Sequence, residues 1–240
     1  MLIIVTDSYR EMSKRAAELV CLEIKRKPEL NLGLATGETP ALMYDELVKL
    51  YKNKQVDFSN VHAFMLDEYY KIPKDNKNSY CSYLHNKIIS KVNIKKSNFN
   101  YLDSEIENIK KFIKKYNRLI RKNPIDLQIL GIGVNGHIGF NEPGSGKFSK
   151  TRLIKLTEST RKANSRFFKS INEVPKYAIT LGIKNILKSK KIILLANGKN
   201  KALAIKNLVK GKPTKNWPAS FLKKHKNLIV ILDKEAASLL

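Results

Sequence analysis

This chain of 240 residues has little cysteine, few acidic side chains and no long apolar run. Its two cysteines, Cys21 and Cys81, are too few for a disulfide framework, which favours a reducing compartment such as the cytoplasm. No apolar stretch approaches the roughly 20 residues that a membrane-spanning helix needs. The amino-terminal residues lack the cationic start and apolar length of a signal peptide, so we expect a first strand there.

The shortage of acidic residues leaves a large positive charge. Lysine and arginine number 46 against 21 aspartates and glutamates, which gives a formal net charge of +25. Such an excess can indicate a nucleic-acid-binding protein. Here the cations are spread along the whole chain, without an aromatic RNA-binding motif, zinc-ligand spacing or basic tail. We therefore expect lysine-rich surfaces that attract an anionic metabolite, and neither nucleic acid nor membrane as a partner.

Short apolar runs alternate along the chain with longer amphipathic stretches. We expect strands at Leu2–Val5, Leu32–Ala35, Val61–Leu66, Leu127–Leu130, Ile192–Ala196 and Leu228–Leu232, and helices at Ser8–Lys25, Pro40–Tyr51, Glu105–Lys122 and Lys199–Val209. This alternation predicts a single α/β domain over residues 1–240, with a doubly wound, mostly parallel, Rossmann-like sheet and helices on both faces. Residues from about 149 to 181 break the alternation, and we expect them to form a lid.

A glycine-rich segment, residues 131–144, directly follows one expected strand. It holds five glycines together with Asn135, His137 and Glu142. Glycine allows close approach of the backbone to a ligand, and a histidine near a carboxylate can transfer protons near neutral pH. We interpret the segment as a catalytic loop; a plain solvated loop is the alternative.

The same segment imitates nucleotide-binding motifs. Its glycines at 131, 133 and 136 match the pattern G-x-G-x-x-G, which requires a helix that opens at the third glycine. Gly139 and Pro143 would break such a helix at once. The run 144–147 is similar to a P-loop, but Phe148 stands where that motif needs serine or threonine. Both nucleotide interpretations are disfavoured.

A candidate anion site follows the strand Leu32–Ala35. In the run Thr36-Gly37-Glu38-Thr39-Pro40, Thr39 is expected to cap a helix that begins at Pro40. The free N–H groups of a helix start attract anions, and Gly37 lets a phosphate come close. A plain capped turn is the alternative. Arg166 and Lys201, further along the chain, are candidates to complete a phosphate site.

Paired acids, Asp67 and Glu68, follow the strand Val61–Leu66. Such a pair at a strand end can carry protons, bind a metal or cap a turn. The four histidines show no metal-ligand spacing, so we expect no metal. Because ligands of open α/β sheets bind beyond the carboxyl ends of the strands, all three motifs are expected to meet there.

Together these residues resemble the glucosamine-6-phosphate deaminase family. The matching stretches run in family order over nearly the whole chain: Leu34–Pro40, Leu66–Tyr69, Gly136–Pro143, Arg161–Phe168, Val174–Ala178 and Lys201–Ala204. The resemblance implies an isomerising hydrolase of amino-sugar and N-acetylglucosamine catabolism. Such an enzyme converts glucosamine 6-phosphate and water into fructose 6-phosphate and ammonia, and it requires no cofactor.

The resemblance also implies roles for individual residues. Asp67 matches the base that moves a proton between C2 and C1 of the sugar, and His137 matches the group that opens the ring, with Glu142 as its partner. Gly37, Glu38, Arg166 and Lys201 align with the phosphate site. Asn135 departs from the aspartate of many members. Because an amide orients an imidazole without stabilising its cation by charge, we assign that assistance to Glu142.

Two other functions remain as alternatives. A 6-phosphogluconolactonase-type hydrolase would share the architecture, but the residues after His137 and the acidic pair favour the deaminase. A non-catalytic sugar-phosphate sensor would need an attached DNA-binding unit. We expect a sugar phosphate as the small-molecule partner and a monomer or small homo-oligomer in the cytoplasm.

Overall fold

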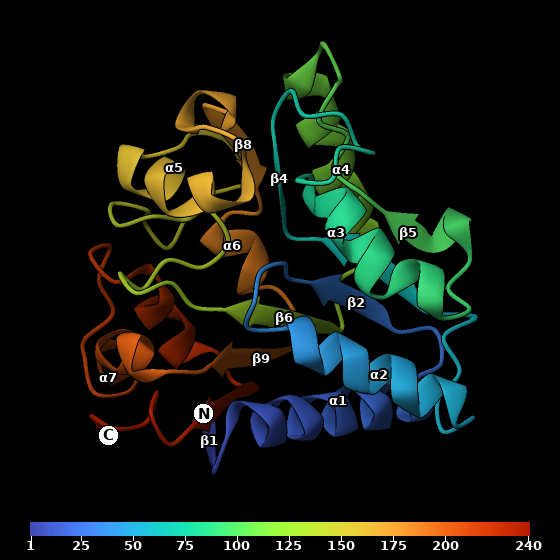
Figure 1. Cartoon of the computed structure of the whole chain (residues 1–240), viewed down its shortest axis with the longest axis vertical. Helices are drawn as coiled ribbons and strands as arrows, with labels where there is room; N and C mark the ends of the chain where they lie inside the picture. Colours follow the sequence, from blue (N-terminus) through green and yellow to red (C-terminus); the bar gives the residue numbers. More distant parts are fainter.

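The computed structural model describes residues 1–240 and is built around a seven-stranded parallel sheet (Figure 1). In spatial order the strands are β1 (Leu2–Thr6), β10 (Leu228–Asp233), β9 (Lys191–Ala196), β6 (Leu127–Gly131), β2 (Asn31–Leu34), β3 (His62–Met65) and β5 (Phe99–Asn100). All six pairings between neighbours are parallel. The mostly parallel sheet and all six expected strands are therefore confirmed, and β5 is an additional edge strand.

Seven α-helices accompany these strands. They are α1 (Tyr9–Arg26), α2 (Ala41–Lys52), α3 (Tyr80–Lys87), α4 (Ile109–Lys122), α5 (Glu158–Asn164), α6 (Ile183–Ile186) and α7 (Ala202–Val209). A short 3-10 turn, η5 (Lys199–Lys201), precedes α7, so the expected helix from Lys199 has a tighter first turn. The expected helix from Glu105 begins four residues later, where the Asn108 side chain accepts a hydrogen bond from the N–H of Lys111. None of these helices is both long and apolar enough to cross a membrane.

The helices lie on both faces of the sheet because the direction of winding reverses. From β1 through β2 and β3 to β5 the chain moves toward one edge, and α1 packs on α2 and α2 on α3. From β5 through β6 and β9 to β10 it moves back. Since crossovers between parallel strands are right-handed, α4, α6 and α7 cover the other face. The central strands are accordingly buried on both sides, and residues 192–196 of β9 are fully inaccessible.

A small antiparallel sheet stands beside the large one. Its strands, in order, are β4 (Asp67–Tyr69), β8 (Tyr177–Thr180) and β7 (Arg152–Lys155). The acidic pair therefore opens a new strand after β3, where the sequence indicated only a strand end. Both ends of the expected lid, residues 149–181, are strands of this sheet. Only its middle, with α5 and the turns that follow, contributes no strand, and α5 has no buried residue.

The start of α2 also differs from expectation. The helix begins at Ala41, and Pro40 is its N-cap residue with no side-chain hydrogen bond. Thr39 therefore does not cap the helix. The first turn is closed by the backbone: the carbonyl of Glu38 accepts from Ala41 at 3.1 Å, and that of Pro40 accepts from Tyr44 at 3.1 Å. No side chain accepts a hydrogen bond from the backbone N–H groups of Gly37, Glu38 and Thr39, which precede the helix.

The junction between β8 and α6 leaves no space for a side chain. A Cβ at Gly182 would lie 2.2 Å from the carbonyl oxygen of Ser149. We expect Gly182→Ala to lower the free energy of unfolding by about 1–3 kcal/mol, because the backbone must shift to relieve the overlap. Denaturant unfolding would measure the change. Gly146→Ala is the control, because nothing lies within 4 Å of a Cβ there; equal losses for both variants would contradict the close packing.

Candidate functional site

A cavity of about 600 Å³ opens at the carboxyl ends of the central strands. It lies where β2 and β6 meet and the winding reverses, which is the usual ligand site of an open α/β sheet. Six of the residues singled out from the sequence line it: Gly37, Glu38, Asp67, His137, Arg166 and Lys201. The two others, Asn135 and Glu142, stand behind His137 and hold its ring.

The two adjacent acids have different surroundings. Side chains alternate along a strand, and Asp67 lines the cavity whereas Glu68 is completely buried behind it. The Glu68 carboxylate accepts hydrogen bonds of 2.7–2.9 Å from the N–H of Tyr69 in β4 and from those of Tyr80 and Cys81 at the start of α3. Glu68 therefore anchors a helix, and only Asp67 is free to act on a ligand.

The Asp67 carboxyl group is kept out of water without a compensating partner. Asp67 is 5% exposed, and its side chain makes no hydrogen bond within the protein. Burial, with a smaller contribution from the charge of Glu68, raises the pKa of Asp67 to about 8. A carboxylate with so high a proton affinity is a strong base for its type.

His137 is held by an amide rather than directly by a carboxylate. The Oδ1 atom of Asn135 lies 2.7 Å from the His137 Nδ1 atom, and it accepts a hydrogen bond of 3.2 Å from the backbone N–H of His137. The Nδ2 group of Asn135 donates to Glu142 at 2.8 Å. The amide oxygen of Asn135 and the carboxylate of Glu142 can only accept hydrogen bonds. The proton of the imidazole ring therefore belongs on Nδ1, and Nε2 keeps a free lone pair.

Glu142 also lies within ion-pair distance of His137, further from the ring than Asn135. The Glu142 Oε1 atom lies 3.6 Å from the His137 Nδ1 atom, so the carboxylate acts mainly through Asn135. Burial lowers the pKa of His137, although the charge of Glu142 opposes the shift. A neutral imidazole whose orientation is fixed can take up a proton at Nε2.

Two glycines make room for these side chains. A Cβ at Gly133 would lie 2.2 Å from the His137 ring, so the backbone there forms the surface against which the ring packs. Gly139 has a φ of +55°, and a Cβ there would lie 3.2 Å from the Asp67 carboxylate. The glycine density that marked this loop in the sequence therefore reflects close approach of the backbone to both acid–base residues.

Thr160 was missed in the sequence. It lies on α5, within the expected lid, and lines the cavity. Its hydroxyl donates a hydrogen bond of 2.6 Å to Glu142 Oε1. Thr160 therefore connects the small-sheet segment to the residues that hold His137, and no local motif marks a contact across 18 positions of chain.

The other end of the cavity presents backbone N–H groups. Tyr83 and Tyr9 donate from their hydroxyls to the carbonyls of Gly37 and Glu38, at 2.6 and 2.5 Å. No hydrogen bond within the protein uses the N–H groups of Gly37, Glu38 or Thr39. With Gly37 at a φ of +100°, this turn at the start of α2 suits a bound anion.

Two cations line the cavity beside this turn. Lys201 ends η5, and burial lowers its pKa while the charge of Glu38 opposes that shift. The Arg166 Nη2 atom lies 3.2 Å from Glu38 Oε1 in an exposed ion pair. Asp233 accepts from the N–H of Gly198 and so holds the turn that carries Lys201. The predicted phosphate-site residues are thus brought together.

The described residues contain no group of three or more histidine, cysteine, aspartate or glutamate side chains placed to hold a metal ion. The cavity instead offers an acid–base pair, Asp67 and His137, at one end and anion-binding groups at the other. A ligand that suits both ends is a small molecule with a reactive carbon centre and a phosphate group.

Comparison with known proteins places this arrangement in a family. The family model described as glucosamine-6-phosphate isomerases/6-phosphogluconolactonase matches residues 6–231. A glucosamine-6-phosphate deaminase of Clostridium botulinum is 52% identical over 239 residues, which cover 99% of this chain and 98% of the relative. One from Thermoanaerobacter sp. (strain X514) is 50% identical over 241 residues, at 100% and 95% coverage. The chain therefore belongs to the glucosamine-6-phosphate deaminase family.

Solved structures agree with that assignment. The structure of a monomeric glucosamine-6-phosphate deaminase superposes with a TM-score of 0.97 at 40% identity, and the match covers the whole of both chains. A 6-phosphogluconolactonase from Trypanosoma brucei superposes with a TM-score of 0.79 at 19% identity, covering 100% of this chain and 98% of that one. The second likeness shows the shared fold alone.

The raised pKa of Asp67 predicts a pH-dependent stability. An unfolded aspartate ionises near pH 3.9, and the folded one near pH 8, so between these values only the folded chain keeps the proton. Stability from this group is therefore present below about pH 4 and falls as the pH rises toward about 8. We expect Asp67→Asn to raise the Tm, and the gain should grow from pH 5 to pH 8.

Calorimetry at several pH values would test this expectation. Asp57→Asn is the control, because hydrogen bonds from Ser59 and Asn93 lower the pKa of that exposed carboxyl. Its stabilising contribution is lost only at lower pH, so the control should show no trend between pH 5 and pH 8. A gain for Asp67→Asn that shrinks with rising pH would refute the assigned shift.

Proposed function

We propose that this chain converts glucosamine 6-phosphate and water into fructose 6-phosphate and ammonia, in the catabolism of amino sugars. The observation that carries the proposal is that one cavity contains a buried unpartnered carboxylate, an oriented neutral imidazole and an anion-binding turn. Relatives at 50–52% identity over nearly their full length are glucosamine-6-phosphate deaminases.

The phosphate group binds at the start of α2. The free N–H groups at Gly37, Glu38 and Thr39 donate to its oxygens, and Lys201 and Arg166 supply positive charge. Arg166 exchanges its ion pair with Glu38 for the more highly charged phosphate. Binding at this end positions the sugar carbons toward Asp67 and His137.

His137 opens the sugar ring. Its Nε2 atom takes the proton from the hydroxyl on C1, the C1–O5 bond breaks, and the proton passes to O5. The product is the open-chain aldehyde. The transient positive charge on the His137 imidazole is stabilised by Glu142, which acts through the Asn135 amide and also directly at 3.6 Å. This is general acid–base catalysis by a group with its proton fixed on Nδ1.

Asp67 then carries out the isomerisation. Its carboxylate takes the proton from C2 and returns it to C1, while one ammonium proton moves to the oxygen on C1. The carbon–nitrogen bond at C2 becomes an iminium. Water adds there and ammonia leaves, which yields the ketone of fructose 6-phosphate. The raised pKa of Asp67 suits removal of a proton from carbon.

The segment between β7 and β8 is proposed to act as the lid. Thr160, Ala163, Asn164 and Arg166 from this segment line the cavity. Because the flanking strands pair with each other and β8 pairs with β4, movement is restricted to α5 and the turns up to residue 173. We also propose that the chain works as a monomer or small homo-oligomer in the cytoplasm, without nucleic acid. A similar solved structure is that of a monomeric enzyme.

A coupled assay tests the reaction. Ammonia and fructose 6-phosphate should both appear from glucosamine 6-phosphate, and the lactone of 6-phosphogluconate should not be hydrolysed. Asp67→Asn should lower kcat by about a thousandfold or more, since an amide cannot accept the transferred proton. Activity on the lactone alone would overturn the proposal.

His137→Gln separates ring opening from the later steps. The variant should lose about 100-fold in kcat/KM on the cyclic sugar. An open-chain substrate should recover part of that loss, because the step assigned to His137 is then bypassed. Equal losses on the two substrate forms would contradict the role, and Asp67→Asn is the control in which no recovery is expected.

Thr160 is proposed as a positioning residue that acts through Glu142. Thr160→Val removes the 2.6 Å hydrogen bond to the carboxylate and keeps the side-chain volume. We expect kcat to fall by about tenfold, because a hydrogen bond to a charged group contributes about 1.5–3 kcal/mol. Thr160→Ser keeps the hydroxyl and should retain most of the activity. If the serine variant loses as much as the valine variant, Thr160 acts through packing alone.

A further inference from the structure

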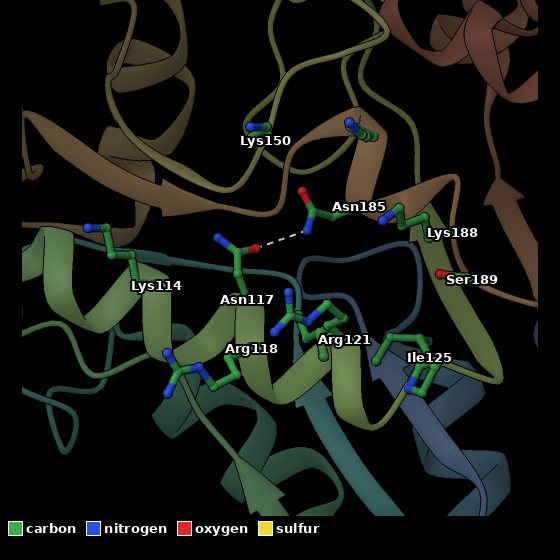
Figure 2. Close-up of a pocket in the computed structure, with 12 residues that line it drawn as sticks. Lys114, Asn117, Arg118, Arg121, Ile125, Lys150, Asn185, Lys188 and Ser189 are labelled. Carbon is green, nitrogen blue, oxygen red and sulfur yellow. Dashed lines mark hydrogen bonds between the residues drawn. The ribbon is translucent and has the colours of Figure 1, made fainter.

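A second cavity, of about 670 Å³, lies between α4 and α6 and is distinct from the first (Figure 2). The two cavities share no lining residue. Ile125 and Ser189, which precede β6 and β9, line this second cavity, so it lies toward the amino ends of those strands. The candidate active site is at their carboxyl ends. We call it the basic cavity, after its six cationic lining residues: Lys114, Arg118, Arg121, Lys150, Lys184 and Lys188.

These six cationic side chains have no partner within the protein. No acidic residue lines the basic cavity, and none of the six side chains forms an ion pair or donates a hydrogen bond within the protein. The nearby Asp126 carboxylate is already paired with Lys27 and Lys190. Six like charges around one hollow repel one another, and a bound anion would relieve that repulsion.

The positions of the cations follow from local structure. Lys114, Arg118 and Arg121 are spaced by four and three residues, which places them on one face of α4. Lys184 and Lys188 are four residues apart on and just beyond α6 and form another wall. Both groups line the same cavity, and Figure 2 shows Lys114, Arg118 and Arg121 along α4 with Lys188 just beyond α6. Helical spacing therefore gathers charges that look evenly scattered in the sequence.

Neutral donors complete the lining. The Ser189 side chain is buried, and its hydroxyl has no hydrogen-bond partner in the protein. Figure 2 draws this hydroxyl on the side that faces the hollow. Asn117 accepts a 2.9 Å hydrogen bond from Asn185, which leaves the amide nitrogen of Asn117 free to donate. A buried hydroxyl without a partner is costly, and a ligand oxygen would satisfy it.

We propose that the basic cavity binds a small ligand through a chain of linked phosphate groups, such as a triphosphate. A single phosphate carries too little charge to match six cations, whereas a triphosphate carries several charges along an extended chain. No aromatic residue lines the cavity, so a nucleobase would find no ring to stack on. Recognition therefore rests on the phosphates, and it is independent of the deaminase reaction.

Titration calorimetry with inorganic triphosphate tests the proposal. The cavity variant is Arg121→Gln with Lys188→Gln, and the matched control is Lys111→Gln with Lys122→Gln. The control removes the same charge from exposed positions, both on α4, that do not line the basic cavity. We expect wild type and control to bind alike and the cavity variant to bind about tenfold more weakly, because each lost cation removes charge-assisted hydrogen bonds. Equal affinities for the two variants would overturn the proposal, since any binding in the active-site cavity affects both equally.

Ser189→Ala provides an independent check. Because the hydroxyl has no partner in the free protein, the variant should fold with an unchanged or slightly higher Tm. It should nevertheless bind inorganic triphosphate several-fold more weakly. An unchanged affinity would contradict the assignment of this hydroxyl to the ligand.

Binding measurements with two further ligands identify the source of the phosphate chain. Adenosine triphosphate should show the same loss in the cavity variant as inorganic triphosphate, since the base contributes nothing to binding. A DNA duplex should show no cavity-dependent binding in physiological salt. If the duplex alone binds, and does so through Arg121 and Lys188, the proposal of a small phosphate ligand is wrong.

Discussion

The burial of the Asp67 carboxylate without a partner is the constraint on which the site depends. Asp67 stands where the chain leaves β3 of the large sheet and enters β4 of the small one. Its backbone pairs with Thr180, whose hydroxyl in turn accepts from the N–H of Phe140 in the glycine-rich loop. The same contacts that keep water from the carboxylate thus also position the glycine-rich loop. A high proton affinity and a fixed loop have one structural cause.

A series of three consecutive hydrogen bonds links His137 to α5. His137 contacts Asn135, Asn135 contacts Glu142, and Glu142 contacts Thr160 on α5. An amide in the middle fixes the direction of each hydrogen bond, because one end only accepts and the other only donates. The Asn135 amide lies closer to the imidazole of His137 than the Glu142 carboxylate does, at 2.7 Å against 3.6 Å. The imidazole therefore stays neutral through burial while its tautomer is set by the series.

The positive charge of the chain has an organisation that composition conceals. Lysines occur along the whole sequence, and most lie on exposed surface. Two of the cations, Arg166 and Lys201, converge on the anion-binding turn at the start of α2. Another set gathers around the basic cavity on α4 and α6, beside an aspartate whose charge is already neutralised. One surface composition thus gives two separate positive hollows at opposite ends of the same sheet.

The sequence by itself determined the parallel sheet and all six expected strands, because periodicity is a local property. It also proposed the eight candidate site residues, through local glycine-rich and acidic motifs and through the resemblance to a family. Tertiary structure decided the rest. The pairing of β4 with β8, the tyrosine hydroxyls that turn the Gly37 and Glu38 carbonyls away, and the contact of Thr160 with Glu142 join residues from 18 to 113 positions apart. Asn135 became the direct partner of His137 because both lie in one tight turn against Gly133, and only the folded backbone shows which of two neighbouring polar groups reaches the ring.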